Sequence, residues 1–135
     1  MMKKIFLFLV TIFNIVTLNA QTKEDLNYWN EVMEKIAKVE SNKNPKVVNK
    51  IYVGYLQISP GVVKDVNEFI KQEKYTLDDR YDITKSKEMF VIYQKRYNKN
   101  KNIEKGIRIW NGGPSKYLND KTLRYYKLVM QSDSL

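Results

Sequence analysis

The chain of 135 residues contains no cysteine and no histidine, and only five glycines and three prolines. Without cysteine it has no disulfide framework, no thiol nucleophile and no thiolate metal site. Without histidine it has neither a Ser-His-Asp triad nor an ordinary zinc hydrolase site. We therefore expect no metal and no cofactor, and any hydrolytic chemistry must use carboxylates for proton transfer. This restriction favours glycoside chemistry, in which carboxylates are the usual acids and bases.

The first twenty residues have the three-part layout of a secretory signal. Two lysines form a basic start, residues 5–16 are apolar apart from two polar positions, and residues 18–20 offer a cleavage site. The apolar run is shorter than the ~20 residues that a membrane-spanning helix needs. We therefore interpret residues 1–20 as the signal peptide of a periplasmic or secreted protein with no stable membrane span after cleavage. A retained membrane anchor is the alternative.

Removal of this leader would leave residues 21–135, which is the length of one small domain. The chain has 24 basic and 15 acidic residues, and two of the lysines lie in the leader, so 22 basic residues and a net charge of +7 would remain. In an exported protein this charge favours an anionic extracellular polymer or envelope surface over nucleic acid as the partner. The oligomeric state has no signature in the sequence.

The remaining chain consists of short helical patterns separated by polar turns. We predict a mostly α fold, a single small domain of about five helices with a short irregular or hairpin segment near residues 46–58. The helices are expected at about 24–40, from Ser59-Pro60 onward, from Asp82 onward, at 102–110 and at 120–130.

Two of these helices have clear starts, and the last has a predicted apolar face. Ser59 and Asp82 are expected to be N-cap residues, because short polar side chains accept hydrogen bonds from the first free amides of a helix. The last helix is expected to carry Leu123, Tyr126 and Met130 on one face.

Glu40 breaks the apolar pattern of the first predicted helix. The next position on its apolar stripe carries a carboxylate, which is costly at a core-facing site unless it is paired or neutral. Desolvation would raise the pKa of this carboxyl, as a general acid requires. We interpret Glu40 as a candidate catalytic acid. The stripe that leads to it comprises Leu26, Trp29, Met33, Ile36 and Ala37.

Three short segments follow one another in a specific order. The first is Glu40-Ser41-x-x-Asn44-Pro45, the second Gly54-Tyr55-Leu56-Gln57-Ile58, and the third Ile109-Trp110-Asn111-Gly112-Gly113. This series resembles the motifs of the lytic transglycosylases (SLT-like domains) of the lysozyme superfamily, and the resemblance extends over roughly residues 24–130. It implies a lysozyme-like domain over residues 21–135.

The resemblance also implies a reaction and residue roles. Glu40 would be the single acid/base that cleaves the glycosidic bond between N-acetylmuramic acid and N-acetylglucosamine, giving a 1,6-anhydro product. Ser41 would support Glu40, Gln57 would hydrogen-bond the substrate, and Asn111 would close the opposite wall of the cleft. The expected partner is therefore the glycan strand of cell-wall peptidoglycan.

Some positions depart from the family pattern. Ile51-Tyr52 replaces a Gly-Ala pair, and Trp110 replaces a tyrosine, which removes a phenol hydroxyl. Tyr93 and Tyr117 are candidates to supply that hydroxyl, while Tyr52 and Tyr55 flank a glycine that lets backbone approach a ligand. These departures keep open a non-catalytic glycan-binding or envelope-interaction module on the same fold.

A hydrolytic lysozyme with two catalytic carboxylates is the other alternative. Asp65 and Glu68 are expected on the solvated polar face of the second helix. Asp78-Asp79-Arg80 is interpreted as a turn with a local ion pair, and Asp82 as a helix cap. None of these carboxylates lies on an apolar stripe as Glu40 does, so the transglycosylase is the favoured hypothesis.

Overall fold

The computed structural model describes the backbone of residues 2–133 and the side chains of residues 21–133. Over this range the chain is mostly helical with one two-stranded antiparallel hairpin. The prediction of a small helical domain with a hairpin near residues 46–58 is therefore confirmed. The elements are α1 (Met2–Ser41), β1 (Val48–Asn49), β2 (Tyr52–Val53), α2 (Pro60–Ile70), the 3-10 helix η1 (Leu77–Tyr81), α3 (Ile83–Tyr97), α4 (Ile103–Gly112) and α5 (Asp120–Gln131).

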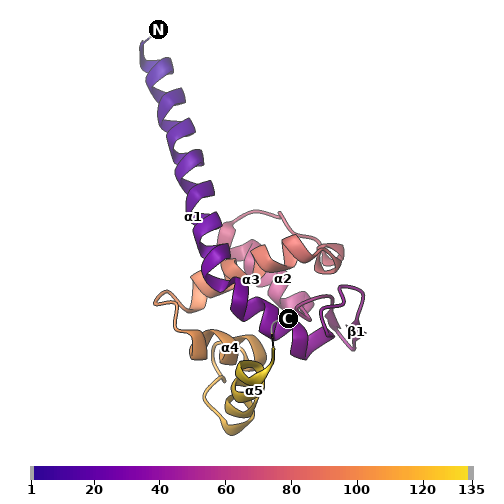
Figure 1. The fold of residues 1–135 in the computed structure, drawn as a ribbon. Helices are drawn as coiled ribbons and strands as arrows, with labels where there is room; N and C mark the ends of the chain where they lie inside the picture. Colours follow the sequence, from indigo (N-terminus) through magenta and orange to yellow (C-terminus); the bar gives the residue numbers. More distant parts are fainter. Residues whose placement is uncertain (1, 134–135) are drawn as a thin grey trace.

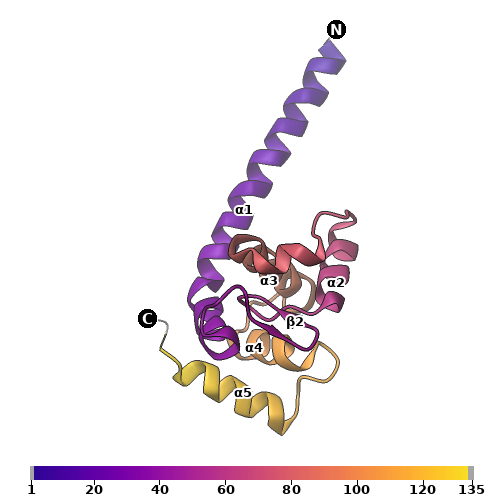
Figure 2. The ribbon, with the colours of Figure 1, turned by 90° about the vertical axis from the view of Figure 1, so that its right-hand side faces the viewer.

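The first helix is longer than the sequence pattern predicts. Its backbone is helical from Met2 instead of from about residue 24, and its first part projects away from the other elements (Figures 1 and 2). The predicted leader, residues 1–20, lies outside the residues whose side chains are described, so its role stays a prediction. Within the described part of the chain, no helix combines the length and the apolar character needed to cross a membrane.

The hydrophobic core forms where the second half of α1 packs against the other helices. The predicted stripe is confirmed at Trp29, Met33 and Ile36, which are almost completely buried. The ring of Phe90 in α3 lies between Trp29 and Trp110, with centroid distances of 5.7 Å and 4.8 Å. Each such buried side chain stabilises the fold by about 1.5–3 kcal/mol. This packing fixes the last turn of α1, which carries Glu40.

The helix starts follow the expected capping chemistry. The Ser59 hydroxyl accepts a hydrogen bond from the Val62 amide at 3.3 Å, and Asp82 Oδ1 accepts one from the Lys85 amide at 2.8 Å. Both predicted N-caps are therefore confirmed. These caps set where α2 and α3 begin on either side of η1.

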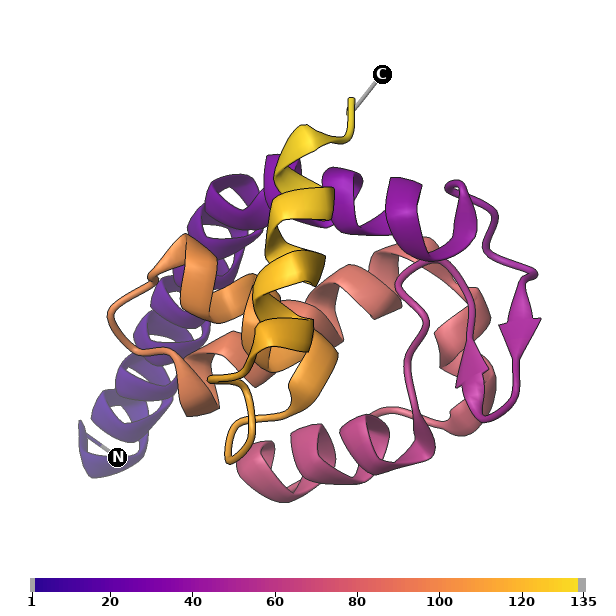
Figure 3. The same cartoon turned by 90° about the horizontal axis from the view of Figure 1, so that it is seen from below.

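The apolar face predicted for α5 is only partly the face that packs, since Leu123 and Tyr126 are partly buried and Tyr126 contacts the core. The helix buries Thr122 and Val129, whereas Met130 is 40% exposed. On the buried side of the helix, Arg108 Nε of α4 donates to Thr122 Oγ1 at 3.2 Å. Figure 3 shows α5 lying over α4 and the last turns of α1. This orientation brings Tyr125 to the end of α1.

The predicted ion pair within Asp78-Asp79-Arg80 is also wrong. This segment belongs to η1, and the buried Arg80 guanidinium donates to the carbonyls of Ile51 at 3.1 Å and Ile58 at 3.2 Å. Asp79 instead pairs with Lys85 at 2.9 Å. Arg80 therefore holds η1 against the hairpin and the segment that follows it.

Candidate active site

Glu40 lies on the last turn of α1 and is half-buried. Its Oε1 accepts a hydrogen bond from the Tyr125 hydroxyl of α5 at 2.6 Å. The two residues are 85 positions apart in the sequence, so the contact depends on the packing of α5 against α1. The structure thus holds the candidate acid between two helices with a tyrosine against one of its oxygens.

The environment of Glu40 changes its acidity. Burial raises the pKa of the Glu40 carboxyl above its ordinary value of 4.5, and the hydrogen bond from Tyr125 only partly opposes this rise. Burial, followed by the nearby Glu40 carboxylate, also raises the pKa of Tyr125 well above its ordinary value. Tyr125 therefore stays a hydrogen-bond donor, and Glu40 keeps its proton to a higher pH than an exposed glutamate does. Both properties suit a general acid.

Ser41 connects α1 to the second motif. Its buried hydroxyl donates to the Tyr55 carbonyl at 2.8 Å, and it also lies 3.2 Å from the Ala37 carbonyl. Ser41 thus supports the candidate site through the backbone of residues 54–57, which form a tight turn between Val53 and Ile58.

The turn at residues 54–57 is held from two further directions. Gln57 Nε2 donates to the carbonyls of Val47 at 3.0 Å and Gly54 at 2.9 Å. Trp110 Nε1 donates to the Leu56 carbonyl at 3.2 Å. The three motifs, which are separated by many residues in the chain, therefore meet at this turn.

The Tyr55 side chain ties the turn to Glu34 of α1. Its ring is buried, and its hydroxyl lies 2.9 Å from both carboxylate oxygens of Glu34. Glu34 in turn pairs with Lys87 at 2.6 Å and Lys43 at 3.0 Å. Burial first, and then Glu34, raise the pKa of Tyr55. The predicted contact between Tyr55 and substrate stays a prediction, and its visible role is to anchor the turn to α1.

A cavity of about 290 Å³ opens beside the same turn. Gln57 and Tyr52 line it from the hairpin side, and Asn111 lines it from the end of α4. Asn111 Oδ1 is buried and has no hydrogen-bond partner among the described residues. Because an unsatisfied buried carbonyl oxygen costs free energy, a hydrogen-bond donor brought to this atom would be stabilising.

Tyr93 contributes to the wall of this cavity from α3. Its ring packs edge-on against Trp110 and Tyr97, with centroid distances of 5.4 Å and 4.9 Å. Burial first, and then the charge of Asp65, raise the pKa of the Tyr93 hydroxyl. Tyr93 therefore contributes a neutral phenol to the cavity wall, and its predicted role beside Glu40 stays a prediction.

Three of the other candidate carboxylates are engaged elsewhere. Asp65 was expected in solvent, but it is half-buried, pairs with Arg96 and accepts a hydrogen bond from Tyr97 at 2.7 Å. Asp79 is bound to Lys85, and Asp82 caps α3. Within the described part of the chain, no group of three or more acidic side chains lies close enough together to hold a metal ion.

Tyr125 is the site residue that sequence reasoning missed. Thr122, Tyr125 and Val129 follow one another at helical spacing, and this alternative stripe was the available signal. The sequence also contains the predicted stripe through Tyr126. Only the packing of α5 on α4 shows that the stripe through Tyr125 is the one that reaches Glu40.

Replacing Tyr125 by phenylalanine is expected to raise the pKa of Glu40 further. The hydrogen bond from the Tyr125 hydroxyl favours the ionised carboxylate, and phenylalanine removes it while keeping the site buried. Titration of the glutamate Cδ resonances by NMR would measure the change. Tyr126→Phe is the matched control and should leave this pKa unchanged. A fall in the Glu40 pKa in Tyr125→Phe would contradict the described electrostatics.

No family model, curated protein or solved structure matches this chain.

Proposed function

We propose that the protein is an exported peptidoglycan lytic transglycosylase that uses Glu40 as its single acid/base. The observation that carries the proposal is the placement of Glu40. It is half-buried, its pKa is raised, and it adjoins Ser41, which is bound to the turn where the second and third motifs meet. The resemblance of those motifs to the transglycosylase series supports the same reaction.

In the proposed reaction, Glu40 first donates its proton to the oxygen of the bond between N-acetylmuramic acid and N-acetylglucosamine. The bond between this oxygen and muramyl C1 then breaks, and positive charge develops on the muramyl ring. The Glu40 carboxylate next takes the proton from the muramyl 6-hydroxyl while that oxygen bonds to C1. The products are a 1,6-anhydromuramyl end and a free N-acetylglucosamine 4-hydroxyl, and Glu40 regains its proton.

Tyr125 supports both steps of this cycle. Burial favours the protonated acid before the first step, whereas the Tyr125 hydroxyl stabilises the carboxylate that the first step leaves behind. A pKa that burial raises and a hydrogen bond partly lowers suits a residue that must act first as an acid and then as a base.

The cavity beside the turn is the proposed place for a sugar of the glycan strand. The free Asn111 Oδ1 would accept a hydrogen bond from a sugar hydroxyl or acetamido N–H, and Tyr52 would offer its half-exposed ring to a pyranose face. Gln57 is fixed there by its two hydrogen bonds to backbone carbonyls, so its amide oxygen is presented in a defined direction.

Asn111→Ala is expected to weaken binding of glycan strands about tenfold without lowering stability. The substitution removes the proposed ligand acceptor, which accounts for the affinity loss. The same atom is buried without a protein partner, so its removal should leave the free energy of unfolding unchanged or increased. Affinity and thermal unfolding would be measured together. Asn27→Ala, at an exposed position of α1, is the control and should change neither quantity. Loss of stability with unchanged affinity in Asn111→Ala would assign Asn111 a purely structural role.

A glycan-binding module on the same fold is the second candidate. It is favoured by one observation, which is that Glu40 is not among the residues lining the cavity that holds Gln57 and Asn111. A hydrolytic lysozyme has less support, because Asp65 and Asp79 are both held in ion pairs.

Digestion of purified sacculi, followed by mass spectrometry of the released muropeptides, separates these functions. A transglycosylase releases 1,6-anhydro ends, a lysozyme releases reducing ends, and a binding module releases no fragments.

A further inference from the structure

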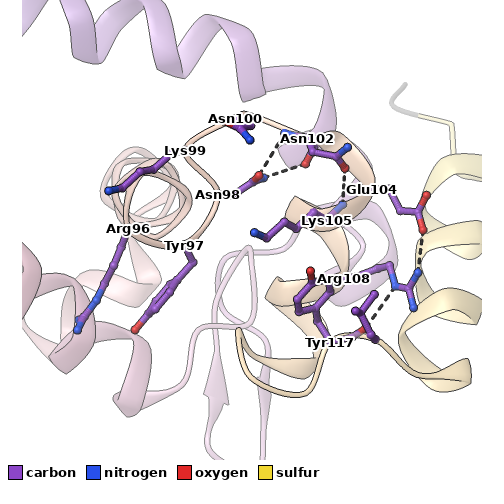
Figure 4. A pocket seen from close by; sticks show the side chains of 11 residues that line it. Arg96, Tyr97, Asn98, Lys99, Asn100, Asn102, Glu104, Lys105, Arg108 and Tyr117 are labelled. Carbon is purple, nitrogen blue, oxygen red and sulfur yellow. Dashed lines mark hydrogen bonds and ion pairs between the residues drawn. The ribbon is translucent and has the colours of Figure 1, made fainter.

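A second and larger hollow, of about 690 Å³, lies between the end of α3 and the start of α4 (Figure 4). We refer to this hollow and its lining residues as the basic groove. Its walls carry four cationic side chains and two tyrosines: Arg96, Lys99, Lys105, Arg108, Tyr97 and Tyr117.

Two of the four cations are already neutralised by carboxylates. Arg96 pairs with Asp65, and Arg108 pairs with Glu104 at 2.7 Å. Lys99 and Lys105 form no ion pair with any described residue, and Lys99 is exposed. The basic groove therefore keeps two uncompensated positive charges, one on the loop before α4 and one in the first turn of α4.

The surroundings of these lysines also suit an extended polar ligand. Lys105 extends from α4 into the space between the two segments, while Lys99 and Asn100 lie on the loop that joins α3 to α4 (Figure 4). The Lys105 ammonium lies 5.8 Å from the centroid of the Tyr117 ring. The first turn of α4 also borders the groove, and the N-terminal end of a helix favours negative charge.

The basic groove adjoins the cavity proposed to hold a sugar. Asp65 lines that cavity and is bound by Arg96 and Tyr97 of the groove. The Tyr93 ring, on the cavity side, packs against Tyr97 at 4.9 Å. The contacts of Asp65 with Arg96 and Tyr97 therefore form the boundary that the cavity and the basic groove share.

We propose that the basic groove binds the carboxylates of the peptides that branch from a peptidoglycan glycan strand, with Lys99 and Lys105 as the recognising residues. This inference rests on the function proposed above, and it names a substrate feature that the catalytic step does not require. A glycan backbone alone is a poor match for two free ammonium groups, whereas a branching peptide supplies anionic groups and amides beside the sugar it is attached to. The neighbouring asparagine and tyrosine side chains fit those amides.

The test compares two forms of one ligand in a non-cleaving background. Soluble peptide-bearing glycan strands would be titrated into Glu40→Gln protein, alongside the same strands after their peptide carboxylates have been converted to amides. The double variant Lys99→Gln/Lys105→Gln is expected to bind the carboxylate-bearing strands about tenfold more weakly and the amidated strands with nearly unchanged affinity. Lys23→Gln/Lys127→Gln removes two exposed lysines outside the groove and should change neither affinity. Lys99→Arg/Lys105→Arg keeps both charges and should retain binding.

Two results would overturn the inference. One is an equal loss for both forms of the strand, which would mean that the lysines do not recognise carboxylates. The other is no loss for either form, which would leave the cavity as the binding site and the proposed function intact. If the parent protein bound neither form of the strand, the proposed function would fail together with the inference.

Discussion

Replacing Glu40 by glutamine is expected to lower the release of soluble fragments from sacculi by about 10³-fold, within the usual range for loss of a general acid. Glutamine keeps the shape of the side chain and can still accept the hydrogen bond from Tyr125, but it cannot donate a proton to the glycosidic oxygen. Binding of the variant to sacculi should be retained. Fragment release would be followed by absorbance of the supernatant and binding by sedimentation with sacculi.

The unfolding temperature of Glu40→Gln and the activity of a second glutamate variant provide the controls. Because burial raises the pKa of Glu40, the folded state holds this proton more tightly than the unfolded state, and stability declines as the pH rises above 4.5. Glu40→Gln should therefore unfold at pH 7 at a temperature equal to or above that of the native chain. Glu31→Gln, at a largely exposed position on the same helix, should keep full activity. Substantial fragment release by Glu40→Gln would exclude Glu40 as the acid.

Gly54→Ala is expected to cost about 3 kcal/mol or more of stability and to abolish activity with it. Gly54 has a φ of +87°, a conformation that other residues rarely adopt. A Cβ at this position would overlap the carbonyl oxygen of Arg80 and lie 2.9 Å from its carbon. Both partners are backbone, so neither the turn nor η1 can move away without breaking the contacts of Arg80 to the hairpin. Chemical denaturation would measure the loss.

Gly61→Ala is the matched glycine control. Gly61 is in the first turn of α2, and an added Cβ would meet only the Ser59 hydroxyl at an ordinary 3.7 Å. Alanine is the better helix former, so this variant should be as stable as the native chain or more stable by up to about 1 kcal/mol. Equal stability of Gly54→Ala and Gly61→Ala would show that the turn is not constrained as described.

The features predicted correctly from the sequence were those with a local cause. The apolar stripe that ends at Glu40 follows helical spacing, and the caps at Ser59 and Asp82 need only residues within one turn. The hairpin region was located because Asn44-Pro45 ends the helix and the apolar residues after it lack helical spacing.

The errors concern contacts between distant parts of the chain. Arg80 binds the carbonyls of Ile51 and Ile58, which lie 29 and 22 positions earlier in the chain. The ion pair predicted between Arg80 and its neighbouring aspartates was therefore wrong. Asp65 is held by Arg96, 31 positions later. The face of α5 was predicted only in part, because a short helix with aromatic residues on two sides has two possible stripes, and the structure buries the one that contains Thr122, which is bound by Arg108.

The candidate site was predicted in the same uneven way. Glu40 was identified because its carboxylate interrupts a local pattern, whereas Tyr125 depends on helix packing across 85 positions. Only the structure shows that Ser41 and Trp110 donate hydrogen bonds to the turn at residues 54–57. Their partners are backbone carbonyls, which no sequence pattern identifies.

Mass spectrometry of the muropeptides released from purified sacculi by the native protein tests the central claim most directly. A lytic transglycosylase that uses Glu40 as acid and then base must release fragments ending in 1,6-anhydromuramic acid, each lighter by one water than the hydrolytic product. These fragments should be absent when Glu40→Gln is used. Fragments with reducing ends would identify a hydrolase instead. The absence of any soluble fragment, in a preparation that still binds sacculi, would contradict catalysis by Glu40.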